Sequence, residues 1–262
     1  MAVEPVTGHD VTRVRADNPG PLTLDGSNSW VIGRDPCWVV DPGPRLEDHV
    51  RQLSGEVEER GGLGGIALTH RHPDHDEAVP ALRERAGEAP VAGATAADVT
   101  LRDGQAFGPL TAVPVPGHTP DHLAFVAGPV CFTGDAVLGE GSVFVAPRPG
   151  AMSGYLEALR RLRGMDLALL CPGHGPPVRR ANAKLDEYLD HRLDRERRLL
   201  AALERGLRDE DDLLDQAWSE VPPPLRPVAA LNLRAHLHKL AEDGRLPLGV
   251  EVPEPGDLGP VV

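Results

Sequence analysis

The feature that most constrains this chain is a cluster of ionisable side chains in residues 67–75, which read ALTHRHPDH. Imidazole and carboxylate groups are the ligands that suit zinc and similar metal ions. Alternate residues of an extended segment point the same way, so His70 and His72 can bind one ion. The chain then turns at a proline, which allows Asp74 and His75 to face a second ion nearby. The alternative is a solvated histidine-rich loop, but four ligand-type residues within six positions favour a metal site.

Three further segments share one pattern, in which a single ligand-type residue ends an apolar run and has a glycine beside it. They are Pro116-Gly117-His118-Thr119, Thr133-Gly134-Asp135 and Pro172-Gly173-His174-Gly175. Glycine allows the backbone to turn tightly and to approach a bound group closely. Each segment alone is as consistent with an ordinary loop. Their occurrence in this order after the first cluster favours one shared metal centre.

Strand-length apolar runs and helix-like segments alternate from about residue 10 to residue 175. The apolar runs are bounded by turn residues and include residues 30–32, 37–40, 65–68, 111–115, 122–126, 129–132 and 167–170. The helix-like segments are residues 46–60, 78–86 and 153–163. Many strands with helices between them predict a layered α/β domain.

The pattern becomes helical towards the C-terminus. Residues 182–206 contain no proline, and no glycine before Gly206, which predicts one long helix with a charged, solvated face. A short helix over residues 209–218 and another helix over residues 228–244 follow, and residues 245–250 can form a terminal strand. Three helices followed by a short strand are typical of a small winged-helix unit.

These motifs, HxHxDH, PGHT, GD and GHG in this order, resemble those of the metallo-β-lactamase superfamily. The stretches GHTPDHLAF, FTGDAVLGEGSVFV, CPGHGPPV and HRLDRERRLL, with NLRAHLHKL near the C-terminus, more closely resemble the group of the endoribonuclease β-lactamase-like protein 2. The similarity covers nearly the whole chain. It implies a four-layer αββα sandwich as the catalytic domain in residues 1–180, a linking helix in 181–205 and a winged-helix-like domain in 206–262.

The resemblance also implies a dinuclear centre, most simply of two Zn²⁺ ions, in which a metal-bridging hydroxide is the nucleophile. One ion would be held by His70, His72 and His118, the other by Asp74, His75 and His174, and Asp135 would bridge both. Asp74 and Asp135 are therefore the expected catalytic carboxylates. Mn²⁺ and Fe²⁺ accept the same donor set.

Three positions near the expected ligands need separate interpretation. Asp41, in VVDPG, matches a carboxylate that supports the ligands from behind. His122 can line a substrate pocket, although a structural role is the simpler interpretation. Asp76 and Glu77 depart from the family, in which small residues follow HxHxDH. These two carboxylates weigh against assigning a substrate of the family to this chain.

Two substrates remain open for a hydrolase of this kind. The first, and the favoured one, is single-stranded RNA, which the whole-chain resemblance implies. The second is an acyl thioester or a related acyl compound, which agrees better with the net charge of −13, because an acidic surface repels phosphate. A third hypothesis is a non-catalytic binding module, in which Arg234, His238 and Lys239 touch phosphate. A solvated helix face is the simpler interpretation of those three residues.

The cellular location of the chain is inferred from its cysteines and its apolar runs. Three cysteines without a CxxC pair predict reduced thiols and a cytoplasmic location. The N-terminal residues lack a basic start followed by an apolar run, and no stretch of about 18 apolar residues occurs, so we expect no membrane span.

Overall fold

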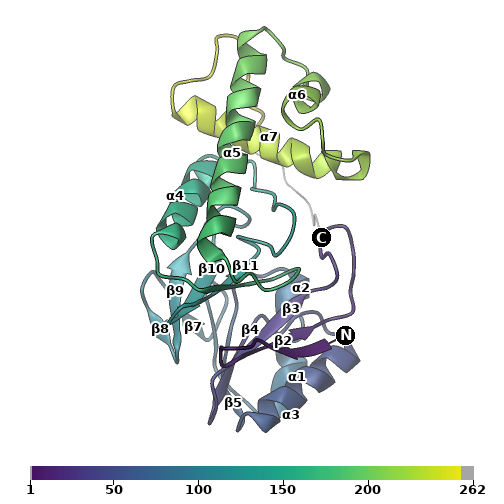
Figure 1. Ribbon diagram of the computed structural model, residues 1–262, viewed down its shortest axis with the longest axis vertical. Coiled ribbons are helices and arrows are strands. Elements are labelled where there is room, and N and C mark those ends of the chain that lie inside the picture. The colour runs from purple at the N-terminus through teal and green to yellow at the C-terminus, as the bar shows by residue number, and fades with distance from the viewer. Residues whose placement is uncertain (1, 255–262) are drawn as a thin grey trace. The chain divides into compact units, whose positions relative to one another are not determined.

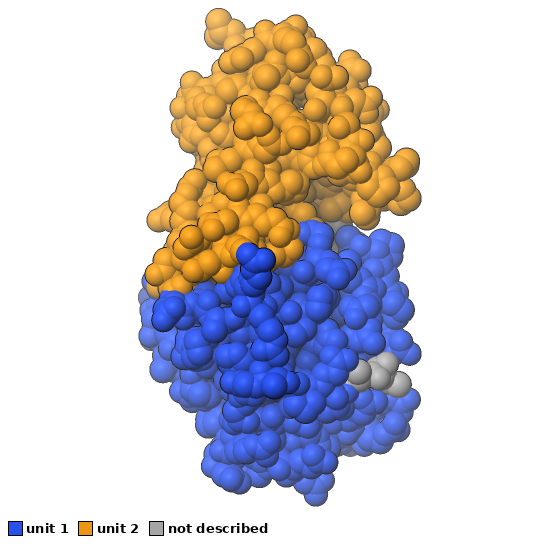
Figure 2. Space-filling view, in the orientation of Figure 1, with its two compact units in different colours: residues 1–115, 121–141, 166–181 blue, residues 116–120, 142–165, 182–262 orange. Residues whose placement is uncertain are grey.

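The computed structural model describes residues 2–254. The chain forms two compact units (Figure 2): unit 1 comprises residues 1–115, 121–141 and 166–181, and unit 2 comprises residues 116–120, 142–165 and 182–262. The division predicted from the sequence, into residues 1–180, 181–205 and 206–262, stays a prediction. Its last residues, 255–262, lie outside the described part of the chain.

Unit 1 contains two β-sheets (Figure 1). The first has seven strands in the order of the chain: β1 (Ala2–Pro5), β2 (Val11–Arg15), β3 (Asn28–Ile32), β4 (Cys37–Val40), β5 (Leu63–Ala67), β6 (Val91–Gly93) and β7 (Val99–Thr100). The second has the order β12-β11-β10-β9-β8, with β8 (Ala106–Phe107), β9 (Leu110–Pro114), β10 (Leu123–Ala127), β11 (Val130–Gly134) and β12 (Leu169–Pro172). The neighbours β4 and β5 run parallel, as do β11 and β12, whereas the hairpins are antiparallel.

Successive side chains of a strand point to opposite sides of a sheet. Because the strands of the first sheet carry apolar residues at successive positions, both of its faces are apolar. Helices α1 (Glu47–Glu59) and α3 (Val79–Ala86) bury one face, and the shared core includes Val31, Val39, Leu53, Ile66 and Leu82. The other face packs on the second sheet, and that core includes Trp30, Val40, Ala67, Phe125, Phe132 and Cys171. The layered α/β domain predicted from the alternating segments is therefore confirmed.

Unit 2 is helical in its regular structure. Its helices are α4 (Ala151–Arg163), α5 (Ala181–Glu204, whose first residue belongs to unit 1), α6 (Glu210–Ala217), the 3₁₀ helix η1 (Pro223–Leu225) and α7 (Arg226–Glu242). The Asp209 side chain caps α6 by accepting the backbone N–H groups of Asp211 and Asp212. An apolar core including Leu203, Leu213, Trp218, Leu233 and Leu237 joins α5, α6 and α7.

Two details differ from the sequence expectations. The predicted strand over residues 245–250 is wrong, because this segment is irregular and turns at residues 248–249, where Val250 N–H donates to Pro247 O at 3.3 Å. The strands β1, β2, β6, β7 and β8 are not among the runs named from the sequence, and the last three have only two or three residues, too few to show an alternating pattern. No helix among the described residues is long and apolar enough to cross a membrane.

Candidate metal centre

The candidate ligands of unit 1 all follow the carboxyl ends of strands. His70 and His72 lie just after β5, and helix α2 (Pro73–Asp76) begins directly after His72. Helix α2 carries Asp74 and His75 in a single turn. Asp135 follows β11, and His174 follows β12. Because parallel strands present their carboxyl ends at one edge of a sheet, ligands from distant parts of the chain meet there.

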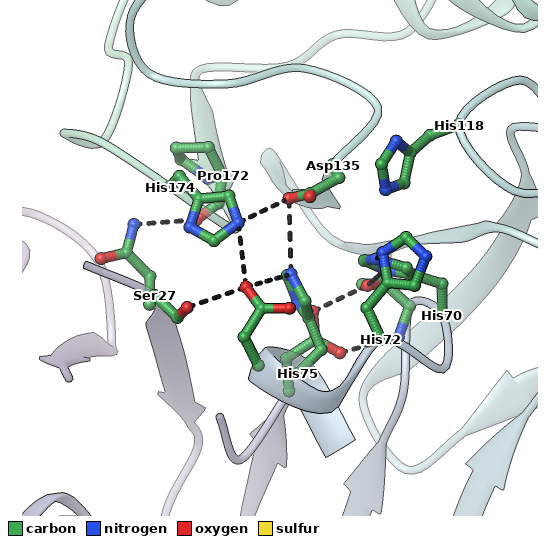
Figure 3. A network of polar contacts seen from close by, with 12 residues as sticks. Ser27, His70, His72, His75, His118, Asp135, Pro172 and His174 are labelled. Atoms are coloured by element: carbon green, nitrogen blue, oxygen red, sulfur yellow. Dashed lines mark hydrogen bonds and ion pairs between the residues drawn. The ribbon is translucent and has the colours of Figure 1, made fainter. Parts of the chain in front are cut away.

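Four of these side chains converge on one point (Figure 3). His75 Nε2 lies 3.5 Å from Asp74 Oδ2 and 3.5 Å from Asp135 Oδ1. His174 Nε2 lies 3.3 Å from Asp74 Oδ2 and 3.4 Å from Asp135 Oδ1. All four side chains are largely buried. The convergence therefore joins two imidazoles and two carboxylates away from solvent.

These separations fit a tetrahedral zinc site. Zinc binds imidazole nitrogen and carboxylate oxygen at about 2.0–2.2 Å, which places neighbouring ligand atoms of a tetrahedron roughly 3.3–3.5 Å apart. The four measured separations fall in this range. They are long for hydrogen bonds, and buried His75 Nε2 has no hydrogen-bond partner within the described residues. The donor set therefore fits a divalent ion better than a network of hydrogen bonds.

A second set of ligand atoms lies next to the first. His70 Nε2 is 3.0 Å from His72 Nδ1. His70, His75 and Asp135 each offer a ligand atom within 4.8 Å of the other two. His118 lies in residues 116–120 of unit 2, and in that unit its Nδ1 donates to Phe144 O at 3.4 Å. Its place as a ligand beside His70 and His72 stays a prediction.

Hydrogen bonds behind the ligands fix which ring nitrogen faces the centre. His75 Nδ1 donates to Asp41 Oδ2 at 3.0 Å, and Asp41 also accepts the backbone N–H and the hydroxyl of Thr69 at 2.8 and 2.7 Å. The Thr69 hydroxyl in turn accepts a hydrogen bond from His70 Nδ1 at 3.0 Å. His174 Nδ1 donates to the backbone carbonyl of residue 26 at 3.5 Å. Such bonds hold a proton on Nδ1 and leave Nε2 as the nitrogen that can bind a metal, as metal-binding histidines require.

The carboxylates of this cluster favour a positive charge at its centre. Burial opposes the charged form of His75, but the carboxylates of Asp135 and Asp74 outweigh it and raise the pKa of His75 well above its usual value. The pKa of His174 is raised in the same way. The pKa of Asp135 is held well below its usual value against the effect of burial, because both imidazoles face it. A bound cation would supply the charge that protons on the histidines otherwise provide.

Gly173 shows how closely the backbone approaches the ligands. A Cβ atom at this position would collide with Asp135 Oδ1 and lie 2.7 Å from His75 Cε1. The glycines noted beside the ligands in the sequence therefore include one that the packing of the centre requires.

Three residues of the segment 27–30 support the centre and were not predicted to do so. The Ser27 hydroxyl donates to Asp74 Oδ2 at 3.0 Å. The Asn28 amide donates to the carbonyls of Pro172 and of residue 175, and Trp30 Nε1 donates to Pro172 O at 3.0 Å. They anchor the loop that carries His174. No local signal reveals these bonds, because they join groups 47 positions apart for Ser27 and more than 140 positions apart for Asn28 and Trp30.

His122 is almost fully buried and contacts ligand residues. Its Nε2 accepts the backbone N–H of Asp135 at 3.1 Å, and its ring stacks on that of His70 at 4.8 Å. These contacts support the structural interpretation of His122, while its part in a substrate pocket stays a prediction.

The two carboxylates that follow the HxHxDH motif are held by groups other than the ligands. Asp76 pairs with Arg71, and Glu77 Oε2 accepts the backbone N–H of Arg45 at 3.1 Å. The two carboxylates that depart from the family pattern are therefore bound to Arg71 and to the backbone of Arg45.

Comparison with known proteins agrees with this fold and site. The family described as Metallo-beta-lactamase superfamily matches residues 98–174, and the Beta-lactamase associated winged helix domain matches residues 210–246. A crystal structure of a beta-lactamase domain protein from Burkholderia ambifaria superposes with a TM-score of 0.76 at 22% identity, over 92% of this chain and 88% of that one. This likeness shows the fold.

Three curated relatives extend the comparison along the chain. The Beta-lactamase-like protein 2 homolog of Caenorhabditis elegans is 28% identical over 92% of this chain and 88% of its own length. The Lactamase-like protein adaB of Aspergillus niger is 30% identical over 93% and 84%, respectively. The Atrochrysone carboxyl ACP thioesterase of Aspergillus fumigatus is 31% identical over 76% and 66%.

With its two sheets and strand-end histidines, this chain belongs to the metallo-beta-lactamase superfamily. It is a metal-dependent hydrolase of that superfamily with an appended winged-helix-associated domain, as predicted.

Proposed function

We propose that this chain is a dinuclear hydrolase of acyl thioesters. The single observation that carries the dinuclear site is the tetrahedral spacing of four buried ligand atoms beside a second pair of imidazoles. The first ion is assigned to His70, His72 and His118, the second to Asp74, His75 and His174, and Asp135 to both. Zn²⁺ is the favoured ion, with Mn²⁺ and Fe²⁺ as alternatives.

When bound, two such ions lower the pKa of a coordinated water towards 7 and polarise a carbonyl or phosphoryl oxygen. The chain itself orients the donors. Asp41 sets the tautomer of His75, Ser27 holds one carboxylate oxygen of Asp74, and the backbone N–H of Asp135 is fixed by His122. These bonds exist before substrate binds, so no further free energy is needed to order the ligand side chains.

The preference for a thioester rests on the charges of α7. Arg234, which was considered for phosphate contacts, forms two hydrogen bonds of 2.8 and 2.9 Å with Glu210. Lys239 Nζ lies 2.9 Å from Glu196 and 2.6 Å from Asp243. His238 is buried. Because carboxylates neutralise these cations, α7 lacks the free positive charge that a nucleic acid backbone requires. The relative named as a thioesterase supports the same choice.

Hydrolysis of single-stranded RNA is the second candidate. It is the activity implied by the resemblance to the β-lactamase-like protein 2 group. The similarity to the Beta-lactamase-like protein 2 homolog covers 92% of this chain and so includes the C-terminal helices.

A direct comparison of the two substrates tests the proposal. Zinc-loaded protein is incubated with a panel of acyl thioesters, with free thiol as the readout, and separately with labelled single-stranded RNA. Asp74→Ala and chelator-treated samples are the inactive references. Asp76→Asn, whose carboxylate pairs with Arg71 instead of the ligands, is the matched control.

Metal-dependent thiol release by the wild type and by Asp76→Asn, with intact RNA, is the expected result. RNA cleavage without thiol release would replace the thioester with the second candidate. If neither substrate reacts although two ions are bound, both substrate assignments are wrong.

A further inference from the structure

The segment 143–146 in unit 2 is a buried loop with an unusual set of backbone partners. It lies between β11 and α4, forms no strand, and its four residues are each less than 9% exposed. Buried backbone N–H and C=O groups that lack a sheet partner must be satisfied by other groups. In this loop the partners come from two sources, the helices α5 and α7 and the turn that carries His118.

The helices supply the first two partners. Arg192 of α5 donates to Val143 O, and Asn232 of α7 accepts the backbone N–H of Val145 at 2.9 Å. The same Asn232 oxygen accepts Arg192 Nη1 at 3.0 Å, so the two side chains form one unit. Arg192 is 1% exposed and Asn232 is 7% exposed. A buried guanidinium held in this way has little freedom to move.

The turn that carries His118 supplies the other two partners. His118 Nδ1 donates to Phe144 O at 3.4 Å, and its ring meets that of Phe144 edge to face at 4.5 Å. The backbone N–H of Ala146 donates to Gly117 O at 2.8 Å. Consecutive residues of the loop are thus bound alternately by the helices and by the His118 turn.

A second contact joins the same groups. The Arg192 guanidinium lies over the Tyr155 ring at 5.6 Å. The Tyr155 side chain packs on Gly117, where a Cβ atom would lie 2.8 Å from Tyr155 Cβ. Gly117 has a φ of +150°, which few other residues adopt. Arg192 therefore supports the His118 turn from two directions, through the loop and through Tyr155.

We infer that Arg192 and Asn232 are positioning residues for His118, and that the C-terminal helices thereby help to build the metal centre. This inference rests on the proposed function, because it takes His118 to be a ligand of the first ion. The bond from His118 Nδ1 to Phe144 O leaves Nε2 as the metal-binding nitrogen. The HRLDRERRLL and NLRAHLHKL segments, which contribute Arg192 and Asn232, then have a role that requires no contact with substrate.

The metal content of full-length variants tests the inference. Asn232→Leu removes the acceptor for Val145 N–H and Arg192, whereas Asn232→Asp retains a carboxyl oxygen there. Glu196→Gln is the matched control, because Glu196 is a buried residue of α5 that binds Lys239 and Arg245 but not the loop. Each protein is equilibrated with zinc buffers, and the bound zinc and its affinity are measured after circular dichroism has shown a folded chain.

We expect Asn232→Leu to bind one of the two ions about tenfold or more weakly, as His118→Ala does, and the other ion normally. Asn232→Asp and Glu196→Gln should bind both ions like the wild type. If Asn232→Leu does not fold, Arg192→Lys takes its place, since an ammonium cannot reproduce the fork that reaches Val143 and Asn232 together.

The possible failures point to different errors. Retention of both ions by Asn232→Leu, while His118→Ala loses one, would overturn the positioning role alone. Retention of both ions by His118→Ala would remove His118 from the proposed centre, and the inference with it. An equal loss in Glu196→Gln would show general destabilisation of the helices and would also overturn the inference.

Discussion

We predict that a buried histidine behind the candidate metal centre makes the stability of unit 1 sensitive to acid. His49 of α1 is fully buried, and its Nε2 lies 3.0 Å from both Pro42 O and Ser29 Oγ. The turn that it supports follows Asp41, and the backbone N–H of Gly43 in this turn donates to His75 O at 3.0 Å. Burial lowers the pKa of His49 from 6.5 to about 4, against the opposing effect of its bond to Pro42. A second ring proton would sit on Nδ1, which has no hydrogen-bond partner in residues 2–254.

The sign and size of the effect follow from this lowered pKa. Between the folded and unfolded pKa values the unfolded chain binds a proton that the folded chain does not, so the free energy of unfolding falls as pH falls. The loss begins below about pH 6.5 and amounts to roughly 2–3 kcal/mol at about pH 4.5. Above that window His49 is neutral in both states and contributes no dependence on pH.

Urea unfolding of the wild type and of His49→Gln checks this prediction. Both proteins are measured with chelator present at about pH 7.5 and about pH 4.5, so that the other titrating groups and the loss of metal affect both alike. The wild type should lose about 2–3 kcal/mol more than the variant. Glutamine alters the stability at both pH values by a constant amount, which cancels. An equal loss in the two proteins would refute the argument, since it would mean that His49 titrates normally in the folded chain.

Further predictions concern the centre itself. Asp74→Ala should abolish hydrolysis while circular dichroism shows a retained fold, and full turnover would remove Asp74 from the centre. Asp41→Asn replaces an acceptor of His75 Nδ1–H, so metal affinity should fall about 10- to 100-fold in a chelator competition; unchanged affinity would contradict this support role. Gly173→Ala should reduce bound metal because its methyl group collides with Asp135, and a crystal structure with unmoved ligands would disprove the collision. Chelation should lower Tm and zinc should restore it, by about 3 kcal/mol of stability at a free concentration 100 times Kd; a Tm independent of zinc would argue against a metal site in the folded chain.

The ligands close in sequence were the easiest part of the site to predict. His70, His72, Asp74 and His75 lie within six positions, and their geometry follows from one strand end and one helical turn. Asp135 and His174 became recognisable through the order of their motifs and the resemblance to a family. Their actual meeting depends on the pairing of β11 with β12, which no local pattern encodes.

The supporting residues could not be predicted in the same way. Ser27, Asn28 and Trp30 each act through one or two hydrogen bonds to groups at least 47 positions away. A serine or asparagine beside a strand is common, so its type gives no signal. His49 shows the same difficulty, because only the packed fold reveals that it lies behind the Asp41 turn.

In the C-terminal helices, too, some features were predictable from the sequence and others were not. Sequence patterns predicted α5, α6 and α7 within a few residues, because no glycine or proline interrupts the stretch before Gly206 and turn residues separate the two helices that follow. The sequence patterns did not indicate which polar residues of these helices are buried. Arg192 and Asn232 are buried although both occur in charged or polar stretches, and their partners lie in the loop before α4.

The size of α2 has a consequence for how metal leaves the protein. This helix is one turn long, the side chain of its N-cap residue His72 does not cap the helix, and its internal bonds run from residues 75–77 to His72 O and Pro73 O. Opening that turn releases Asp74 and His75 together while both sheets stay intact. Exchange of the ion proposed for Asp74, His75 and His174 should therefore follow a local opening rather than global unfolding. Amide hydrogen exchange in residues 75–77 would then slow as zinc is added, while the central strands keep their own, slower rate.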